Sequence, residues 1–179
     1  FQKIFKSLDI FFSPEFLTEA NHIKDFENQN RIIIGGENKN KLKLINLHSE
    51  IFPNAEIIDT DSLTAEMVKY FANTFLATKV SFANEMFNFC TKLGINYNEV
   101  VKYVLYDTRI GPSHLSVPGP DNKKGYGGSC FPKDIASLIF QFEQYNVKSF
   151  ILKASWQRNN EVDRTEKDWK KLKGRSVVD

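Results

Sequence analysis

A long stretch without glycine or proline, from Ser62 to Leu93, restricts the fold more than any other feature. Beginning with Leu63 and Met67, apolar side chains recur there at three- and four-residue steps. This spacing predicts one helix of about 30 residues, buried on several sides because further apolar residues follow on other faces. We expect Ser62 to cap its amino end and Gly94 to close it in the left-handed conformation. Such length indicates a subunit or domain interface.

Short apolar segments precede this helix at residues 8–12, 31–36 and 55–60. Each is typical of a buried strand, being rich in β-branched or aromatic residues and followed by a turn signal. Leucine and isoleucine at helical intervals predict a helix over residues 39–52, between the last two. The order strand, helix, strand favours a parallel α/β layer. Because three strands do not complete a sheet, we expect residues 1–60 to be the end of a larger domain.

The second half of the chain is predicted to be helical apart from one long loop. A helix begins at Asn96, where Glu99 completes a capping sequence, and runs to about Tyr106. Residues 108–130 are rich in glycine and proline, and long loops of this kind are usually functional. Helices then follow over residues 131–144, where Pro132 suits the first position, and 148–172. The predicted fold is therefore mostly α with a partial α/β layer.

Composition excludes several classes of partner. A formal net charge of +2 gives no general attraction to nucleic acid or membranes, and no segment resembles a signal peptide or a membrane span. The three histidines and the two cysteines, Cys90 and Cys130, show no metal-ligand spacing. We therefore predict a cytoplasmic protein without a metal site. The chain does not begin with methionine and ends as a strand would begin, so we expect a fragment of a longer protein.

The segment GYGGSCFPKD, residues 125–134, places Cys130 directly before a predicted helix. Free backbone amides and the partial positive charge at a helix amino end stabilise a thiolate, and Lys133 would act in the same direction. Gly127 and Gly128 would let a ligand approach the backbone closely. A buried cysteine beside a simple glycine turn explains the same spacing. The segment alone therefore leaves both interpretations of Cys130 open.

Other polar side chains are ambiguous when each is taken alone. Glu15 and Glu19 follow a predicted strand, where open α/β sheets bind ligands, although acidic residues also stabilise the first turn of a helix. Lys69 and Asn73 are four apart on one face of the long helix, yet such residues are usually surface residues. Arg109 could bind a phosphate or carboxylate with two hydrogen bonds, or could form a surface ion pair.

Taken in order, four segments resemble the UDP-glucose/GDP-mannose dehydrogenases: SPEFLTE, AEMVKYFANTFLATKVSFANE, TRIG and GGSCFPKDI. The resemblance covers residues 13–160. It implies a Rossmann-type NAD-binding domain that ends in a parallel sheet over residues 1–60, and a central helical dimerisation domain built on the long helix over residues 61–160. Residues 161–179 would lead to a nucleotide-sugar domain that this chain lacks. No segment supplies the GxGxxG fingerprint of dinucleotide binding.

The resemblance also implies a reaction, the NAD-dependent four-electron oxidation of a nucleotide sugar such as UDP-glucose to the acid. Cys130 would form a thiohemiacetal and then a thioester. Lys69 and Asn73 would stabilise the oxyanion and hold the attacking water, and Asp134 would help to organise Lys69 and that water. Glu15 would be the general base for thioester hydrolysis. SCFPKD is closer to the UDP-glucose enzymes, with GDP-mannose or another nucleotide sugar as the alternative substrate.

The resemblance further implies a wider set of binding residues. Those for the sugar nucleotide are Glu15, Phe16, Leu17, Glu19, Lys69, Asn73, Arg109, Gly125, Tyr126 and Gly127, and those for NAD are Glu19, Cys130 and Lys133. Arg109 would reach the substrate of the neighbouring subunit, so the active form would be a homodimer joined through the long helix. We expect the isolated chain to be inactive. The alternative of another class is a non-catalytic helical dimerisation module, which would have no reason to keep all the reaction residues.

Overall fold

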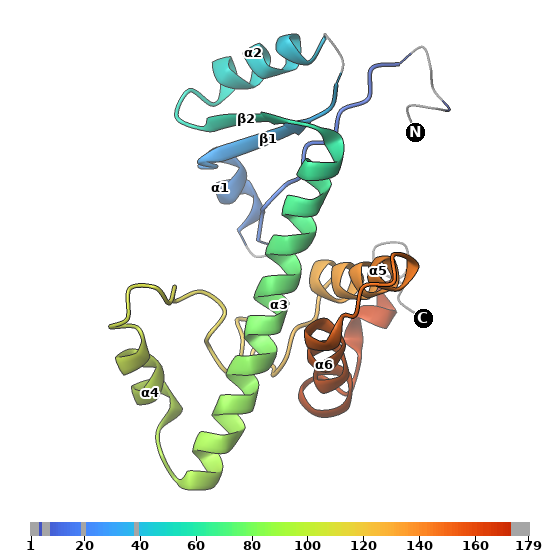
Figure 1. Ribbon diagram of the computed structural model, residues 1–179. Helices are drawn as coiled ribbons and strands as arrows, with labels where there is room; N and C mark the ends of the chain where they lie inside the picture. The colour runs from blue at the N-terminus through green and yellow to red at the C-terminus, as the bar shows by residue number, and fades with distance from the viewer. Residues whose placement is uncertain (1–3, 5–7, 19–20, 38–39, 173–179) are drawn as a thin grey trace. The chain divides into compact units, whose positions relative to one another are not determined.

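The computed structural model describes residues 4, 8–18, 21–37 and 40–172. They form, in order, α1 (His22–Glu27), β1 (Arg31–Gly35), α2 (Lys41–Ile51), β2 (Glu56–Thr60), α3 (Ser62–Leu93), α4 (Tyr97–Val104), α5 (Cys130–Gln144), α6 (Phe150–Arg158), a π-helical turn (Asn159–Asp163) and a 3₁₀ turn (Asp168–Lys171) (Figure 1). The chain divides into two compact units, residues 1–71 and 72–179, and α3 contributes to both. The predicted domain boundaries after residues 60 and 160 stay predictions.

The first unit contains the predicted parallel layer. Strand β1 pairs in parallel with β2, in a register that runs from Arg31 opposite Glu56 to Gly35 opposite Thr60, and α2 connects them. The side chains of residues 32–34 are buried. Gly35 ends β1 against the start of α3, where an added Cβ would lie 2.6 Å from the Ala65 Cβ. The strand, helix, strand prediction is therefore confirmed for residues 31–60.

The strand predicted over residues 8–12 is wrong for the part that the structure describes. Only an isolated antiparallel bridge forms there, in which Phe12 and Gly35 exchange both backbone hydrogen bonds, at 2.9 and 2.7 Å. Two residues later comes Pro14, which has no N–H group to extend a ladder. The segment therefore pairs at one position only.

Helix α3 begins and ends where the sequence predicts, but its amino-terminal cap is Asp61. The Asp61 carboxylate accepts from the backbone N–H of Thr64 at 2.8 Å and from its hydroxyl at 2.6 Å. The prediction of Ser62 as the cap is wrong, because Ser62 is already inside the helix. Gly94 closes the other end with φ +71°, and the N–H of Ile95 bonds back to the carbonyl of Cys90, as predicted.

The second unit confirms two predicted helices and corrects a third. Asn96 caps α4 by accepting from the N–H of Asn98 at 2.9 Å, and α5 begins at Cys130, one residue before the prediction. The single helix predicted over residues 148–172 is wrong. It is divided into α6, the π turn and the 3₁₀ turn, and Lys167 between the two turns has the left-handed φ of +46°.

The core of the second unit forms around the part of α3 that belongs to it. One cluster joins α3 to α4 and the long loop through Ala83, Cys90, Tyr97, Leu115 and Val117. The other joins α3 to α5 through Ala77, Tyr126 and Ile135, so that Tyr126 is buried between them. In the part of the chain that the structure describes, no helix combines the length and apolarity needed to cross a membrane.

Candidate functional site

The two cysteines lie in different environments. Cys130 is the first residue of α5 and is exposed, with its Sγ 3.7 Å from the Ser129 hydroxyl. Cys90 is buried in the core cluster at the far end of α3, where only 2% of it is exposed. The buried-cysteine interpretation therefore fits Cys90 and does not fit Cys130. A substrate can reach the Cys130 thiol, and its role as nucleophile stays a prediction.

A buried carboxylate lies one turn after Cys130. Asp134 is 3% exposed, and its two oxygens accept from different donors. The Asn73 side-chain amide donates to Oδ2 and the Lys133 ammonium to Oδ1, each at 2.5 Å. A buried carboxylate requires such donors, because it has lost its water. The structure thus brings together Asn73 and Asp134, which are 61 residues apart in sequence.

In the first unit, Lys69 lies among the residues predicted to bind the substrate. Its ammonium donates to the backbone carbonyl of Glu15 and lies 3.6 Å from the carboxylate Oε1 of the same residue. The other carboxylate oxygen accepts from the N–H of Leu17 at 3.0 Å. Two cations lie near the Phe16 ring, whose centroid is 5.5 Å from the Lys69 Nζ and 4.4 Å from the Arg31 Cζ. Arg31 is a neighbour that the sequence did not suggest.

The predicted catalytic residues therefore form two described groups. Glu15 and Lys69 are in contact in the first unit, and Asn73 and Asp134 are in contact in the second, where Cys130 begins the helix that carries Asp134. Helix α3 is continuous and carries Lys69 and Asn73 four residues apart. Glu19, predicted to bind both substrate and cofactor, lies outside the described residues.

Arg109 forms the surface ion pair that was one of its two interpretations. Its guanidinium donates with two nitrogens to the carboxylate of Asp107, at 2.9 and 2.6 Å, and 87% of the side chain is exposed. These hydrogen bonds hold the pKa of Asp107 below its usual value. The described residues bring no other predicted site residue to Arg109, so its role toward a neighbouring subunit stays a prediction.

Two buried asparagines that the sequence did not suggest hold the loop before Cys130. Asn159 accepts from the backbone N–H of Tyr126 at 2.9 Å and donates to its carbonyl at 3.0 Å. Asn84 accepts from the N–H of Gly125 at 3.2 Å. Asparagine is a poor residue for a helix interior, so its presence in these helical segments was the available signal. The loop is thus bound to α3 and to the π turn.

The glycines of this loop are required by packing. A Cβ at Gly127 would lie 2.4 Å from the Nη2 of Arg164, whose guanidinium occupies that space. The sequence had suggested that this glycine leaves room for a ligand, and on that side the neighbour is a side chain of the protein. Gly125 has φ +68°, and a Cβ there would lie 2.4 Å from the Oδ1 of Asn159.

Arg164 is the buried member of a charge network whose other members are partly exposed. It is 3% exposed, and its Nη2 lies 2.7 Å from Asp168 and 2.6 Å from Asp121. Lys123 pairs with the same Asp168 at 2.9 Å. Burial alone would raise the pKa of Asp168, but the hydrogen bonds from Arg164 and Lys123 outweigh it and lower this pKa to about 2. The guanidinium is therefore paired with two carboxylates.

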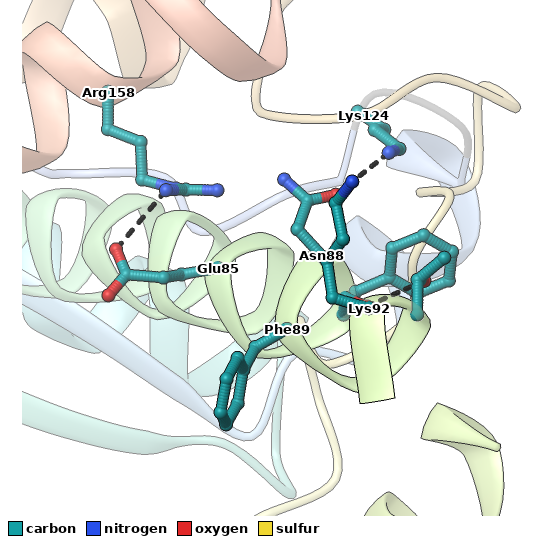
Figure 2. A pocket seen from close by; sticks show the side chains of 8 residues that line it. Glu85, Asn88, Phe89, Lys92, Lys124 and Arg158 are labelled. Atoms are coloured by element: carbon teal, nitrogen blue, oxygen red, sulfur yellow. Dashed lines mark hydrogen bonds and ion pairs between the residues drawn. The ribbon is translucent and has the colours of Figure 1, made fainter. Parts of the chain in front are cut away.

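A separate groove of about 470 Å³ lies on the second unit, and no predicted site residue lines it (Figure 2). Figure 2 shows its polar side chains turned toward one another: Arg158 pairs with Glu85 at 3.2 Å, and Lys124 donates to Asn88 at 2.9 Å. Glu85 and Arg158 thus form an ion pair within the groove, and Lys124 is bound to a neutral amide. Among the described residues, no three histidine, cysteine, aspartate or glutamate side chains are grouped to hold a metal.

Comparison with known proteins identifies the family to which the chain is similar. Residues 63–161 match the central domain of the UDP-glucose/GDP-mannose dehydrogenase family, and residues 2–55 match the NAD binding domain of the same family. The UDP-glucose 6-dehydrogenase of Rickettsia bellii is 41% identical over 157 residues, which are 87% of this chain and 35% of that protein. The chain thus spans about a third of the length of the curated relatives it matches.

Solved structures show the same fold. The chain is similar to a UDP-glucose dehydrogenase from Pyrobaculum islandicum, with 32% identity and a TM-score of 0.75, over 85% of this chain and 34% of that one. It is similar to the GDP-mannose dehydrogenase of Pseudomonas aeruginosa, with 32% identity and a TM-score of 0.51, over 84% and 34%. The predicted fold class, the end of a parallel sheet followed by a helical domain built on one long helix, is confirmed. Because the central-domain match alone covers more than half of its length, this chain belongs to the UDP-glucose/GDP-mannose dehydrogenase family.

Proposed function

We propose that the protein to which these 179 residues contribute oxidises UDP-glucose to UDP-glucuronate with NAD, through a thiohemiacetal and a thioester on Cys130. The observation that carries the proposal is an exposed thiol at the first residue of α5, one turn before a buried Asp134 that is hydrogen-bonded to Asn73 on α3. Relatives about 40% identical are named UDP-glucose 6-dehydrogenase, which supports this substrate.

Cys130 performs the covalent steps. Its thiolate adds to the carbon of the sugar aldehyde, so a C–S bond forms and the carbonyl electron pair moves to oxygen. Two NAD molecules bound in turn would supply the hydride acceptors, one for oxidation of the alcohol and one for oxidation of the thiohemiacetal. Water then adds to the thioester, Glu15 accepts its proton, and the C–S bond breaks with Cys130 leaving as thiolate. The products are the sugar acid and the regenerated cysteine.

The contacts of Asn73 and Lys69 suit them to stabilise the oxyanion. Asp134 takes one N–H of the Asn73 amide and so fixes the orientation of its other N–H and its carbonyl oxygen. Glu15 holds Lys69 through its backbone carbonyl, and the N–H of Leu17 orients the Glu15 carboxylate. Donors that are already oriented stabilise developing negative charge without reorganising during the reaction.

Lys133 fits a cofactor that carries phosphates. Its ammonium pairs with Asp134, yet 47% of its side chain is exposed, three residues after Cys130. A part-exposed cation can bind an anionic group from solvent and keep its own carboxylate partner. We therefore place Lys133 and Cys130 at the NAD site, together with Glu19 as the resemblance implies.

We also propose that the active form is a homodimer joined through α3. Phe75, Phe82 and Phe89 follow one another at seven-residue steps on this helix, and each is 57–62% exposed. Large exposed aromatic residues in a row are typical of an interaction surface. Exposed Arg109 would then be available to the substrate of the partner subunit. The cytoplasmic location stays a prediction.

A second substrate remains a candidate because the two solved structures, one named for UDP-glucose and one for GDP-mannose, have the same 32% identity to this chain. The test is NADH formation by the full-length protein with UDP-glucose and, separately, with GDP-mannose. We expect turnover with UDP-glucose and two NADH for each UDP-glucuronate. Turnover with GDP-mannose and none with UDP-glucose would show that GDP-mannose is the substrate.

The catalytic role of Cys130 is tested by Cys130→Ala, which should abolish formation of the acid. Cys90→Ala, at the buried cysteine, is the matched control and should keep turnover. Normal turnover by the Cys130 variant would remove this residue from the mechanism. The 179-residue chain alone is expected to form no NADH, because it matches only about a third of its relatives.

A further inference from the structure

The loop that leads to Cys130 is held at its centre by one side chain. Asn159 is completely buried, and its amide makes both hydrogen bonds that the backbone of Tyr126 can make, accepting from the N–H at 2.9 Å and donating to the carbonyl at 3.0 Å. A side-chain amide carries one acceptor and one donor group, so it can pair with a backbone N–H and carbonyl as the backbone of a neighbouring strand would. The position of the Tyr126 backbone therefore depends on a residue 33 positions away.

Arg164 supports the next part of the same loop. Its guanidinium packs so closely on Gly127 that a Cβ there would lie 2.6 Å from the Cζ of Arg164. Asp168 and Asp121 both pair with the Nη2 of this guanidinium and so restrict its position. Arg164 is 3% exposed, so its side chain is packed against the loop and covered from solvent.

The π turn allows both residues to reach one loop. The N–H of Arg164 bonds to the carbonyl of Asn159 at 2.8 Å, a bond between residues five apart. In an α-helix, residues three and four apart share a face, and residues five apart do not. A π turn changes this spacing, and such turns are frequent at functional sites. The turn at Asn159–Asp163 thus directs Asn159 and Arg164 toward the same segment.

We propose that Asn159 and Arg164 are positioning residues for sugar-nucleotide binding, because they hold the backbone of residues 125–127 in the conformation that meets the substrate. The proposal rests on the proposed function, in which residues 125–127 contact the sugar nucleotide. Neither residue needs to touch the substrate. Loss of Asn159 should therefore weaken substrate binding more than it slows the chemical steps.

The first experiment uses the 179-residue chain and measures hydrogen exchange of the Tyr126 amide. In Asn159→Ala this amide should exchange about tenfold faster or more, since its acceptor is gone. The matched control is Asn160→Ala, because the neighbouring Asn160 donates only to the carbonyl of Trp156 in its own helix, at 2.7 Å. Unchanged protection in Asn159→Ala, or equal loss in Asn160→Ala, would overturn the proposal.

The second experiment uses the full-length protein and separates KM from kcat. Asn159→Ala should raise the KM for UDP-glucose by about tenfold, while the KM for NAD changes by less than about twofold. Asn159→Asp keeps the acceptor for the Tyr126 N–H and should recover part of the loss. It carries the same test if Asn159→Ala does not fold.

The two proposals fail in different ways. A fall in kcat without a rise in the KM for UDP-glucose would overturn the positioning role of Asn159. Absence of NADH formation by the wild-type protein with any sugar nucleotide would instead overturn the proposed function, and the exchange experiment would still decide whether Asn159 holds the loop.

Discussion

The side-chain amide of Asn73 donates to the carboxylate of Asp134 at 2.5 Å, and both residues are more than nine-tenths buried. The bond joins α3 to α5 within the second unit, one turn after Cys130 on α5. Lys133 supplies the second donor, so the buried carboxylate is paired at both oxygens. One contact therefore serves the packing of two helices and the orientation of a predicted catalytic amide.

Removing Asp134 should destabilise the second unit. In Asp134→Ala the amide of Asn73 is left buried without its acceptor, and an unsatisfied buried donor costs about 1–3 kcal/mol. The measurement is the free energy of unfolding in urea. Glu143→Ala is the control, because the Glu143 pair with Lys153 is half exposed and should contribute less than about 1 kcal/mol.

A double-mutant cycle separates the contact from other effects of substitution. Asn73→Ala and Asp134→Ala should be less than additive, since either change alone removes the hydrogen bond. Additive losses would show that these two side chains do not stabilise each other. Asp134 would then have no part in fixing the orientation of the Asn73 amide.

The amino end of α3 offers a second test, because two neighbouring residues differ in role. Asp61 accepts two hydrogen bonds from Thr64, and these hold the pKa of Asp61 below its usual value. Asp61→Ala should lower the thermal midpoint clearly, whereas Ser62→Ala should leave it nearly unchanged. A larger loss in the Ser62 variant would restore the cap that the sequence predicted.

Local pattern predicted most of the helices and failed where distant residues decide the structure. The limits of α3 follow from its spacing and from Gly94, but Asp61 and Ser62 are both good caps, and only backbone geometry selects between them. The helix predicted over residues 148–172 stops being α-helical at Asn159, whose side chain is bound to Tyr126. Tyr126 lies outside that helix, so the spacing of residues within the helix gives no sign of the contact.

In the site, too, features set by neighbouring residues were predictable, and contacts between distant segments were not. The position of Cys130 at a helix start follows from the local sequence, since glycines precede it and a helical pattern follows, but its exposure is known only from the structure. The pairing of Asn73 with Asp134 joins segments 61 residues apart, and the family resemblance placed both residues in one site without suggesting that they are paired. Asn84 and Arg164 were missed because each contacts loop residues that are distant in sequence, although an asparagine inside a helix was a signal for Asn84.

The aromatic row on α3 predicts how dimerisation can be weakened. Phe82 is the central residue of the row and is 62% exposed. Phe82→Glu would place a charge in the interface and should raise the dimer dissociation constant by about tenfold or more, which corresponds to about 1.4 kcal/mol. Analytical ultracentrifugation at several protein concentrations measures this dissociation constant. Tyr145→Glu, at a residue just after α5 that is 77% exposed, should leave association unchanged. Equal association of wild type and Phe82→Glu would place the interface elsewhere or remove it.

The lowered pKa of Asp168 predicts that protonation of this carboxyl in acid lowers the free energy of unfolding. Its pKa is lowered from an ordinary 3.8 to about 2, since hydrogen bonds from Arg164 and Lys123 outweigh burial. A carboxyl whose pKa is lower in the folded chain stabilises the fold above its unfolded pKa, and this contribution disappears as the pH falls through the folded value. The free energy of unfolding of the wild type should therefore exceed that of Asp168→Asn by a constant amount above about pH 5. The difference should shrink as the pH falls from about 4 to about 2.

Urea unfolding at each pH measures this difference in the free energy of unfolding. Glu143→Gln, at a half-exposed pair, corrects for general effects of removing a carboxylate. A difference that stays constant down to about pH 2 would show that Arg164 and Lys123 do not stabilise the ionised Asp168.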